Sequence, residues 1–341
     1  MCFFTVMPAI VARAPTRLDF GGGWTDVPPY SQEQGGYVCN IAISRYATVR
    51  LESSRLGAPS SSPQSEQALA DAALRLSGLA GVRATIASDF PLGAGLGGSS
   101  AAGVAMMGAV ELWRAMVAGG DDRSAIRDAV SALPSIMNRS HLAEESRRVE
   151  VDELGIAGGR QDHYASAFGG ALALSFGTST VVRELALARA TIRALEARCI
   201  IVYTGQSRMS GDTIRAVLDG YTARDPRVVT ALQRMKGLAA TMTDALLAGD
   251  LDALGILVAE HWVHQRSLHP SITTPLIDEI ITRASAAGAI GGKALGASGG
   301  GCVLLVAARG FEEPVRRAAE ELAELLPFSV DRAGFVGSVT G

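Results

Sequence analysis

A glycine-rich segment ahead of a long apolar stretch has the composition of a phosphate-binding loop. Residues 89–102 read DFPLGAGLGGSSAA, and the residues up to 117 are rich in Ala, Met and Leu. Glycines let backbone N–H groups converge on one point without obstruction by Cβ atoms. A helix that begins there adds unpaired N–H donors and a partial positive charge. The segment therefore predicts a phosphate cradle, in which Ser99 and Ser100 offer hydroxyls to a metal ion bound to that phosphate.

Two other interpretations of this segment stay open. Gly93, Gly95 and Gly98 fit the dinucleotide fingerprint G-x-G-x-x-G. That match is weak, because Pro91 separates the glycines from the preceding strand and no acidic residue follows the next strand at the expected distance of about 20 residues. The glycines can also serve close packing alone. A lysine-dependent P-loop is excluded, because neither of the two lysines stands in G-x-x-x-x-G-K-[ST].

The composition of the whole chain limits the class of protein. The 341 residues include 39 glycines, carry a formal net charge of −3 and are 48% hydrophobic. This hydrophobic content is too high for a disordered chain, and a nucleic-acid binder would usually show a basic excess. The four cysteines form no C-x-x-C pair, which favours free thiols in a reducing compartment. Without a basic signal-peptide region or a run of 18 apolar residues, we expect a soluble cytoplasmic protein with no nucleic-acid or membrane partner.

The hydrophobic pattern predicts an α+β chain of two domains, residues 1–190 and 191–341. In the first part we expect strands at 10–20, 37–51, 82–87, 171–176 and 180–185, and helices at 67–77, 97–117, 124–133 and 135–148. In the second part we expect strands at 199–204, 302–307 and 328–336, and helices at 210–219, 226–248, 251–267, 275–287 and 311–325. Pro15 predicts an edge or a bulge in the first strand.

Three segments in order resemble the motifs of the GHMP kinases, the family of galactokinase, homoserine kinase and mevalonate kinase. Residues 13–26 (RAPTRLDFGGGWTD) resemble its first motif, residues 91–101 (PLGAGLGGSSA) its second and residues 293–303 (KALGASGGGCV) its third. The resemblance implies a ribosomal-protein-S5-like N-terminal domain, a ferredoxin-like C-terminal domain and a site between them for ATP and Mg²⁺. Within the family, residues 20–42 and 154–170 are similar to the sugar-kinase branch of D-glycero-D-manno-heptose 7-phosphate kinases and L-fucokinases.

The resemblance also assigns the residues of phosphoryl transfer, which requires anchored phosphates, a metal that spreads charge and a positioned acceptor hydroxyl. Asp162 is the expected catalytic carboxylate. Arg17 is the arginine expected to stabilise the transferred phosphoryl group or to pair with Asp162. The alternatives are a helix N-cap for Asp162 and an edge-strand surface charge for Arg17.

The expected Mg²⁺ ligands are Glu150 and either Ser99 or Ser100. Glu150 stands twelve residues before Asp162, as the metal-binding glutamate of the family does. Hard oxygen ligands are what Mg²⁺ prefers. Asp152 and Glu153 are close rivals, and a solvated acidic helix end is the plainer interpretation of all three carboxylates.

The remaining site residues follow from the same motifs. The expected nucleotide-binding residues are Pro91, Gly93, Gly95, Leu96, Gly97, Gly98, Ser99, Ser100, Ala101, Gly299 and Gly300. The expected substrate-binding residues are Gly23, Thr25, Asp26, Tyr30, Gly159 and Arg208. Candidates for a second phosphate pocket are Arg160, Arg208, Arg266 and Lys293. His261, His264 and His269 invite a zinc interpretation, but a helical face bordering the active site is favoured, because no supporting Cys or H-E-x-x-H pattern is present.

These observations predict an ATP- and Mg²⁺-dependent small-molecule kinase that acts as a monomer or homodimer. D-glycero-D-manno-heptose 7-phosphate is the leading acceptor, at its anomeric hydroxyl, and a free sugar such as L-fucose is second. A non-catalytic sugar and ATP sensor is the alternative of another class, although such proteins usually lose the catalytic aspartate. A third hypothesis, a dinucleotide-dependent oxidoreductase, is supported by the glycine fingerprint alone.

Overall fold

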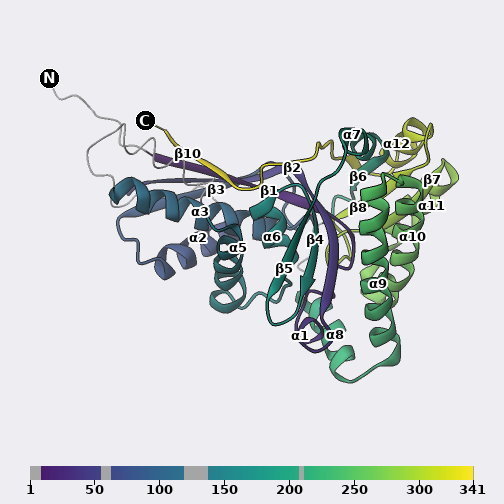
Figure 1. Ribbon diagram of the computed structural model, residues 1–341, viewed down its shortest axis with the longest axis horizontal. Coiled ribbons are helices and arrows are strands. Elements are labelled where there is room, and N and C mark those ends of the chain that lie inside the picture. Colours follow the sequence, from purple (N-terminus) through teal and green to yellow (C-terminus); the bar gives the residue numbers. More distant parts are fainter. Residues whose placement is uncertain (1–8, 55–62, 119–136, 207–210, 341) are drawn as a thin grey trace.

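The computed structural model describes residues 9–54, 63–118, 137–206 and 211–340, which form two antiparallel sheets (Figure 1). The first sheet has the strand order β10-β1-β2-β4-β5, with β3 paired to β2. Its strands are β1 (Ala9–Gly21), β2 (Gly36–Ser53), β3 (Val82–Ser88), β4 (Ala171–Phe176), β5 (Thr180–Leu185) and β10 (Val336–Thr340). The second sheet has the order β7-β8-β6-β9. Its strands are β6 (Cys199–Tyr203), β7 (Ala289–Ala294), β8 (Cys302–Ala307) and β9 (Glu324–Leu325).

The helices connect and cover these sheets. In the first half they are α1 (Tyr30–Gln34), α2 (Gln64–Leu76), α3 (Gly98–Ala118), α5 (Arg139–Arg147), α6 (Gln161–Phe168) and α7 (Arg189–Arg198). In the second half they are α8 (Gly211–Thr222), α9 (Pro226–Ala248), α10 (Leu251–Ser267), α11 (Pro275–Ala286) and α12 (Glu312–Glu320). Helix α3 packs against β1 and β2, α9 packs against β2, and α10 packs against both α9 and β7. The α9–α10 pair therefore joins the first sheet to the second.

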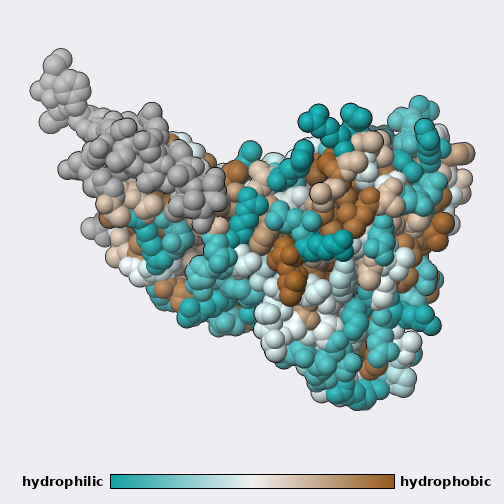
Figure 2. Space-filling view, viewed as in Figure 1, coloured by the Kyte–Doolittle hydropathy of each residue, from teal (hydrophilic) through white to brown (hydrophobic). Residues whose placement is uncertain are grey.

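The surface over this core is mixed in character. On the face shown in Figure 2, hydrophilic residues cover α5 and the ends of α9 to α12, and hydrophobic residues gather near β5 and below α7. Among the described residues, α3 alone is long and apolar enough for a membrane span by length and composition, and 72% of its apolar window is buried inside the protein. Such burial is typical of a core helix.

Local capping explains why several helices lie where the sequence predicts them. Helices α9 and α10 have the expected bounds. The carboxylates of Asp225 and Asp250 accept hydrogen bonds from the backbone N–H of Arg227 and Ala253, which satisfies donors at each N-terminus. Gly249 ends α9 in the left-handed conformation that glycine adopts easily. The predicted bulge is confirmed, because the β1–β2 register shifts between Pro15 and Thr16.

Several sequence-based predictions of elements are wrong. The helix expected at 311–325 ends at Glu320 and is followed by the short strand β9. The strand expected at 328–336 is instead β10, which begins at Val336, because the preceding segment makes only an isolated bridge from Val330 to Ile43. Helix α7 and strand β7 were not expected. The helix expected at 124–133 lies outside the described residues.

The last strand crosses back to the first sheet. Residues 336–340 pair with β1 in an antiparallel register that joins Ala9 to Thr340 and Arg13 to Val336. Figure 1 shows β10 lying along β1, near the N-terminal end of the described chain. A boundary at residue 190 therefore separates the two sheets except for this returning strand. Hydrophobic periodicity predicts a strand but not its partner, so the return could not be expected.

Candidate active site

A cleft of about 530 Å³ brings the three glycine-rich motifs together. Its lining includes Arg17 and Asp19 of β1, the loop residues 90–98 and the first turn of α3. Glu150, the segment 156–159 and Asp162 of α6 also line it. The third motif contributes Gly296 and Ala297 from the loop after β7. Residues that are up to 280 positions apart in the sequence thus share one cavity.

Backbone hydrogen bonds hold the glycine loop in this cleft. The N–H of Arg17 donates to the carbonyl of Leu96 at 3.1 Å, and the N–H of Cys302 donates to the carbonyl of Ala94 at 2.8 Å. The guanidinium of Arg17 also donates from Nη1 to the carbonyl of Gly95 at 2.5 Å. Helix α3 begins at Gly98, so the amides of its first turn have no acceptor within the helix. This arrangement can bind a phosphate group.

Arg17 and Asp162 form a bidentate ion pair at the floor of the cleft. Nε of Arg17 lies 2.8 Å from Oδ1 of Asp162, and Nη2 lies 3.0 Å from Oδ2. The Arg17 side chain is 4% exposed and the Asp162 side chain is 24% exposed. A Cβ at Gly97 would lie 2.9 Å from Cγ of Asp162, so only glycine lets the phosphate loop approach this carboxylate so closely.

Both plainer interpretations of this pair are wrong. Arg17 is buried, so it is not a surface charge on an edge strand. The N-cap of α6 is Arg160, and Asp162 lies within the first helical turn. A carboxylate there is favoured by the helix dipole, and it remains exposed to the cleft.

Glu150 belongs to a buried polar network beside the start of α3. It lies in a π-helical segment (Arg148–Glu153) that continues α5. Its Oε2 accepts a hydrogen bond from the hydroxyl of Ser100 at 2.9 Å and contacts Nε2 of His163 at 3.1 Å. Nδ1 of His163 lies 2.9 Å from the hydroxyl of Ser146. Burial alone would raise the pKa of Glu150, but the hydrogen bonds from His163 and the serines outweigh burial and hold the pKa below its usual value.

The donors around Glu150 fit Mg²⁺ better than zinc. An ionised carboxylate and the hydroxyls of Ser99 and Ser100 line the cleft together at the phosphate loop. Mg²⁺ is usually bound by one or two such ligands, with phosphate and water completing its shell. The described residues contain no cluster of three or more His, Cys, Asp or Glu side chains for a metal. Asp152 and Glu153, the rival carboxylates, do not line the cleft.

Several residues expected to bind substrate do not line the cleft. Gly23 and Gly159 line it, but Thr25, Asp26 and Tyr30 do not. The hydroxyl of Thr25 donates to the carbonyl of Gly22 at 2.7 Å and accepts from the N–H of Tyr37 at 3.1 Å, so it shapes the loop. Tyr30 is 1% exposed and packs edge-on against Tyr221. Arg208 lies outside the described residues.

The structure also corrects the prediction of which third-motif residues line the cleft. Gly299 and Gly300 do not line the cleft, whereas Gly296 and Ala297 do. The N–H of Gly299 donates to the carbonyl of Ile272 at 2.9 Å, which fastens this loop to the neighbouring segment. Ala101 is buried in α3 behind the cleft. The other expected nucleotide-binding residues, from Pro91 to Ser100, do line it.

Asp26 stands behind the cleft wall as a cap for α6. Its Oδ2 accepts a hydrogen bond from the backbone N–H of Gln161 at 3.0 Å, and it is 2% exposed. Burial raises the pKa of Asp26 to about 6, the Gln161 hydrogen bond opposes that rise, and the nearby charges of Asp162 and Asp19 add to it. Asp26 therefore positions the helix that carries Asp162.

The raised pKa of Asp26 predicts a pH-dependent stability. Its folded pKa of about 6 exceeds the reference value of 3.8, so the stability that Asp26 contributes is lost as pH rises from about 4 through 6. Asp26→Asn removes this loss while its amide oxygen can still accept from Gln161. We expect the variant to be more stable than the wild type at pH 8, by on the order of 2 kcal/mol, and similar at pH 4. Urea unfolding at both values measures this, and a difference that is independent of pH would contradict it.

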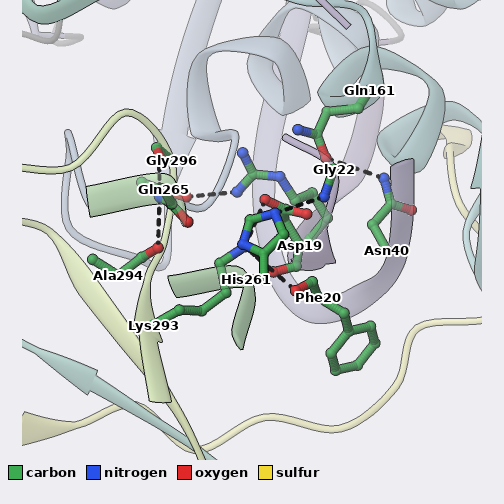
Figure 3. A network of polar contacts seen from close by, with 12 residues as sticks. Asp19, Phe20, Gly22, Asn40, Gln161, His261, Gln265, Lys293, Ala294 and Gly296 are labelled. Atoms are coloured by element: carbon green, nitrogen blue, oxygen red, sulfur yellow. Dashed lines mark hydrogen bonds and ion pairs between the residues drawn. The ribbon is translucent and has the colours of Figure 1, made fainter. Parts of the chain in front are cut away.

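The residues expected to form a second phosphate pocket are not brought together. Lys293 is fully buried and pairs with Asp19 (Figure 3). Arg160 donates to the carbonyl of Gly177 at 3.3 Å, and Arg266 lines a separate surface cavity. The zinc interpretation of the histidines also finds no support, because Nε2 of His261 accepts from the N–H of Gly22 at 2.9 Å. That contact does place the face of α10 against the first motif, as expected.

Sequence reasoning missed several residues of the cleft. They include Asp19, Ser65, Glu66, Leu69, Phe90, Leu154, Ile156, Ala157, Gln161, Ile214, Gly296 and Ala297. Asp19 could have been found, because it lies two residues after Arg17 on a strand and side chains of a strand alternate between its faces. The apolar residues of this set come from separate elements, so no sequence motif marks them as residues of the cleft.

The fold and the cleft define a phosphotransferase that acts on an alcohol group of a small molecule. Two family models match the chain, "GHMP kinases N terminal domain" over residues 66–170 and "GHMP kinases C terminal" over residues 242–327. The protein belongs to the GHMP kinases, which are ATP-dependent.

Its relatives include sugar kinases and mevalonate kinases. A D-glycero-alpha-D-manno-heptose 7-phosphate kinase of Campylobacter jejuni is 26% identical over 337 residues, which cover 91% of each chain. The bifunctional fucokinase/GDP-fucose pyrophosphorylase of Arabidopsis thaliana is 26% identical over 91% of this chain, which spans only 31% of that protein. The crystal structure of a D-glycero-D-manno-heptose 1-phosphate kinase from Bacteroides thetaiotaomicron matches with a TM-score of 0.69 and 23% identity, covering 96% of this chain and 98% of that one.

Proposed function

We propose that the protein transfers the γ-phosphate of ATP to a hydroxyl group of a sugar, with the anomeric hydroxyl as acceptor. The Arg17–Asp162 pair at the phosphate loop carries this proposal. Both oxygens of Asp162 are held by Arg17 at 2.8 and 3.0 Å, and the carboxylate is still exposed to the cleft. A carboxylate held in this way can orient the acceptor hydroxyl and receive its proton as the oxygen attacks phosphorus.

Other residues of the cleft have supporting roles in this proposal. The loop amides and the first turn of α3 bind the phosphates of ATP. Glu150, together with Ser99 or Ser100, would hold Mg²⁺, which supplies positive charge to the phosphate oxygens when it is bound. Arg17 sits where it can stabilise the charge of the transferred group as well as orient Asp162.

The sugar kinases among the relatives name two kinds of acceptor, a heptose 7-phosphate and fucose. A heptose 7-phosphate needs a second anion site, which basic side chains usually provide. Among the described residues that line the cleft, Arg17 is the only basic one, and it is paired with Asp162. Asp19, Glu66 and Glu150 also line it. This balance of charge favours an uncharged sugar over a sugar phosphate as the acceptor.

A kinase assay with a panel of acceptors tests the proposal. The protein is supplied with ATP, Mg²⁺ and one of a series of hexoses, 6-deoxyhexoses, heptoses or their terminal phosphates, and ADP release is followed. We expect release that depends on a free sugar, with the new phosphate found on the anomeric carbon by phosphorus NMR. Failure of every sugar would refute the proposed function. A heptose 7-phosphate used ten times better than any free sugar would refute the preference for an uncharged acceptor.

A further inference from the structure

Asp19 is a carboxylate of the cleft that has no role in the proposed phosphoryl transfer. It follows Arg17 by two residues on β1, so both side chains lie on the same face of the strand. Asp19 lines the cleft together with Gly23 and Trp24, although only 4% of it is exposed. A buried carboxylate at the wall of a substrate cleft requires an explanation, because burying its charge is costly unless the charge is paired.

Lys293 provides that pairing and fixes one carboxylate oxygen. Its Nζ lies 3.0 Å from Oδ2 of Asp19, 3.0 Å from the carbonyl of Asp19 and 3.5 Å from the carbonyl of Phe20. Figure 3 shows Lys293 extending from β7 toward Asp19 and Phe20. Burial lowers the pKa of Lys293, and the charge of Asp19 opposes that change. The ammonium group has three N–H donors, so this one residue can hold both the side chain and the backbone of Asp19.

The second oxygen of Asp19 is left without a partner. Oδ1 is buried and makes no hydrogen bond among the described residues. Buried polar atoms nearly always have a partner, so this oxygen is suited to a donor that arrives with a ligand. A Cβ at Gly23 would lie 2.4 Å from Oδ2 of Asp19. Gly23 therefore packs directly against this carboxylate, and both residues line the cleft.

The charges nearby indicate what that ligand group would be. Asp19 lines the same cleft as Asp162 and Glu150, and the charges of Asp19 and Asp162 both raise the pKa of the neighbouring Asp26. Such a cluster repels a phosphate and attracts neutral O–H donors. A carboxylate that accepts from a hydroxyl, with an aromatic residue such as Trp24 beside it, suits the polar edge and apolar face of a sugar ring.

We propose that Asp19 determines specificity by accepting a hydrogen bond at Oδ1 from a sugar hydroxyl other than the one that is phosphorylated, with Lys293 as its positioning residue. The proposal rests on the proposed function, since it requires a sugar in this cleft. The competing explanation is purely structural: the Lys293–Asp19 pair would only tie β7 of the second sheet to β1 of the first.

Kinetics with monodeoxy analogues separate these explanations. For the preferred sugar, Asp19→Asn should lower kcat/KM about 10- to 100-fold, as loss of a hydrogen bond to a charged group does, while KM for ATP changes less than about twofold. For the one analogue that lacks the hydroxyl bound by Asp19, the substitution should cost less than about twofold, because the wild type has already lost that contact. For the other analogues the full loss should remain.

Two further variants guard against an effect on folding. Asp19→Asn leaves a buried ammonium unpaired, so Asp19→Asn combined with Lys293→Met should recover thermal stability while the discrimination between analogues stays lost. Asp331→Asn is the matched control, because Asp331 is 7% exposed, accepts backbone N–H groups of Ala333 and Gly334, and does not line the cleft. It should act equally on all sugars.

The outcomes are distinct. If Asp19→Asn lowers kcat/KM by the same factor for the sugar and for every analogue, Asp19 is a structural tie and the proposal is overturned. If the wild type phosphorylates no sugar at all, the proposed function fails and this proposal fails with it.

Discussion

Asparagine in place of Asp162 should lower kcat for sugar phosphorylation by about 10³-fold and leave ATP binding within about threefold of the wild type. The amide keeps the shape of the carboxylate beside Gly97, but it cannot take up the proton of the acceptor hydroxyl, and general base catalysis is worth roughly 10²- to 10⁴-fold. The substitution also removes the negative charge opposite Arg17 and one of the two oxygens that the guanidinium binds, although the hydrogen bond from Arg17 to the carbonyl of Gly95 remains. Steady-state kinetics and ATP titration measure the two effects separately.

Asp244→Asn provides the control for this experiment. Asp244 is an exposed carboxylate of α9 and does not line the cleft, so its variant should match the wild type in both measurements. Asp162→Ala should also lose transfer and retain ATP, because the phosphate loop is held by backbone contacts to Arg17 and Cys302. Full activity in either Asp162 variant would remove the basis for the catalytic assignment.

Glutamine in place of Glu150 is expected to lower kcat less than the Asp162 substitution does, by weakening the binding of Mg²⁺. Glu150 is held ionised by His163 and the serines of the α3 start, and a neutral amide is a much poorer ligand for Mg²⁺. We expect kcat to fall about 100-fold and the Mg²⁺ concentration for half-maximal activity to rise about 10- to 100-fold. A second measurement is independent of turnover: the extra thermal stabilisation by ADP when Mg²⁺ is added should be reduced.

Asp152→Asn is the matched variant for Glu150. Asp152 lies in the same π-helical segment but is exposed and does not line the cleft. Its variant should show the wild-type dependence on Mg²⁺. An unchanged Mg²⁺ dependence in Glu150→Gln, or an equal change in Asp152→Asn, would show that Glu150 has no role as a metal ligand.

Most elements of the fold could be predicted because their signals are local. Helices α9 and α10 have the predicted bounds, since an aspartate cap and a glycine end are read from neighbouring residues. The predictions failed where a segment depends on a distant partner. Strand β10 pairs with β1 across the whole length of the chain, and β9 pairs with β6 across more than 100 residues. Neither pairing leaves a trace in the pattern of a short segment.

In the candidate site, too, local motifs predicted some residues, whereas the roles of others depend on contacts between distant segments. The phosphate loop, Arg17, Glu150 and Asp162 were predicted from motifs, and the structure brings them into one cleft. Asp26 was predicted to face the sugar from its place in the first motif, but its carboxylate caps α6 instead. Sequence spacing could not distinguish these roles, because the outcome depends on which polar group folds against the aspartate.

The sequence by itself determined the class of chemistry. A glycine loop at a helix start binds phosphate through its own backbone, so its function can be inferred from a short segment of sequence. Only the tertiary structure decided which side chains meet a substrate. Lys293, one of the two lysines of the chain, is fully buried and does not line the cleft, but pairs with Asp19, 274 residues away. A buried charge needs a partner wherever the fold provides one, and here the partner of Lys293 is a carboxylate that lines the cleft.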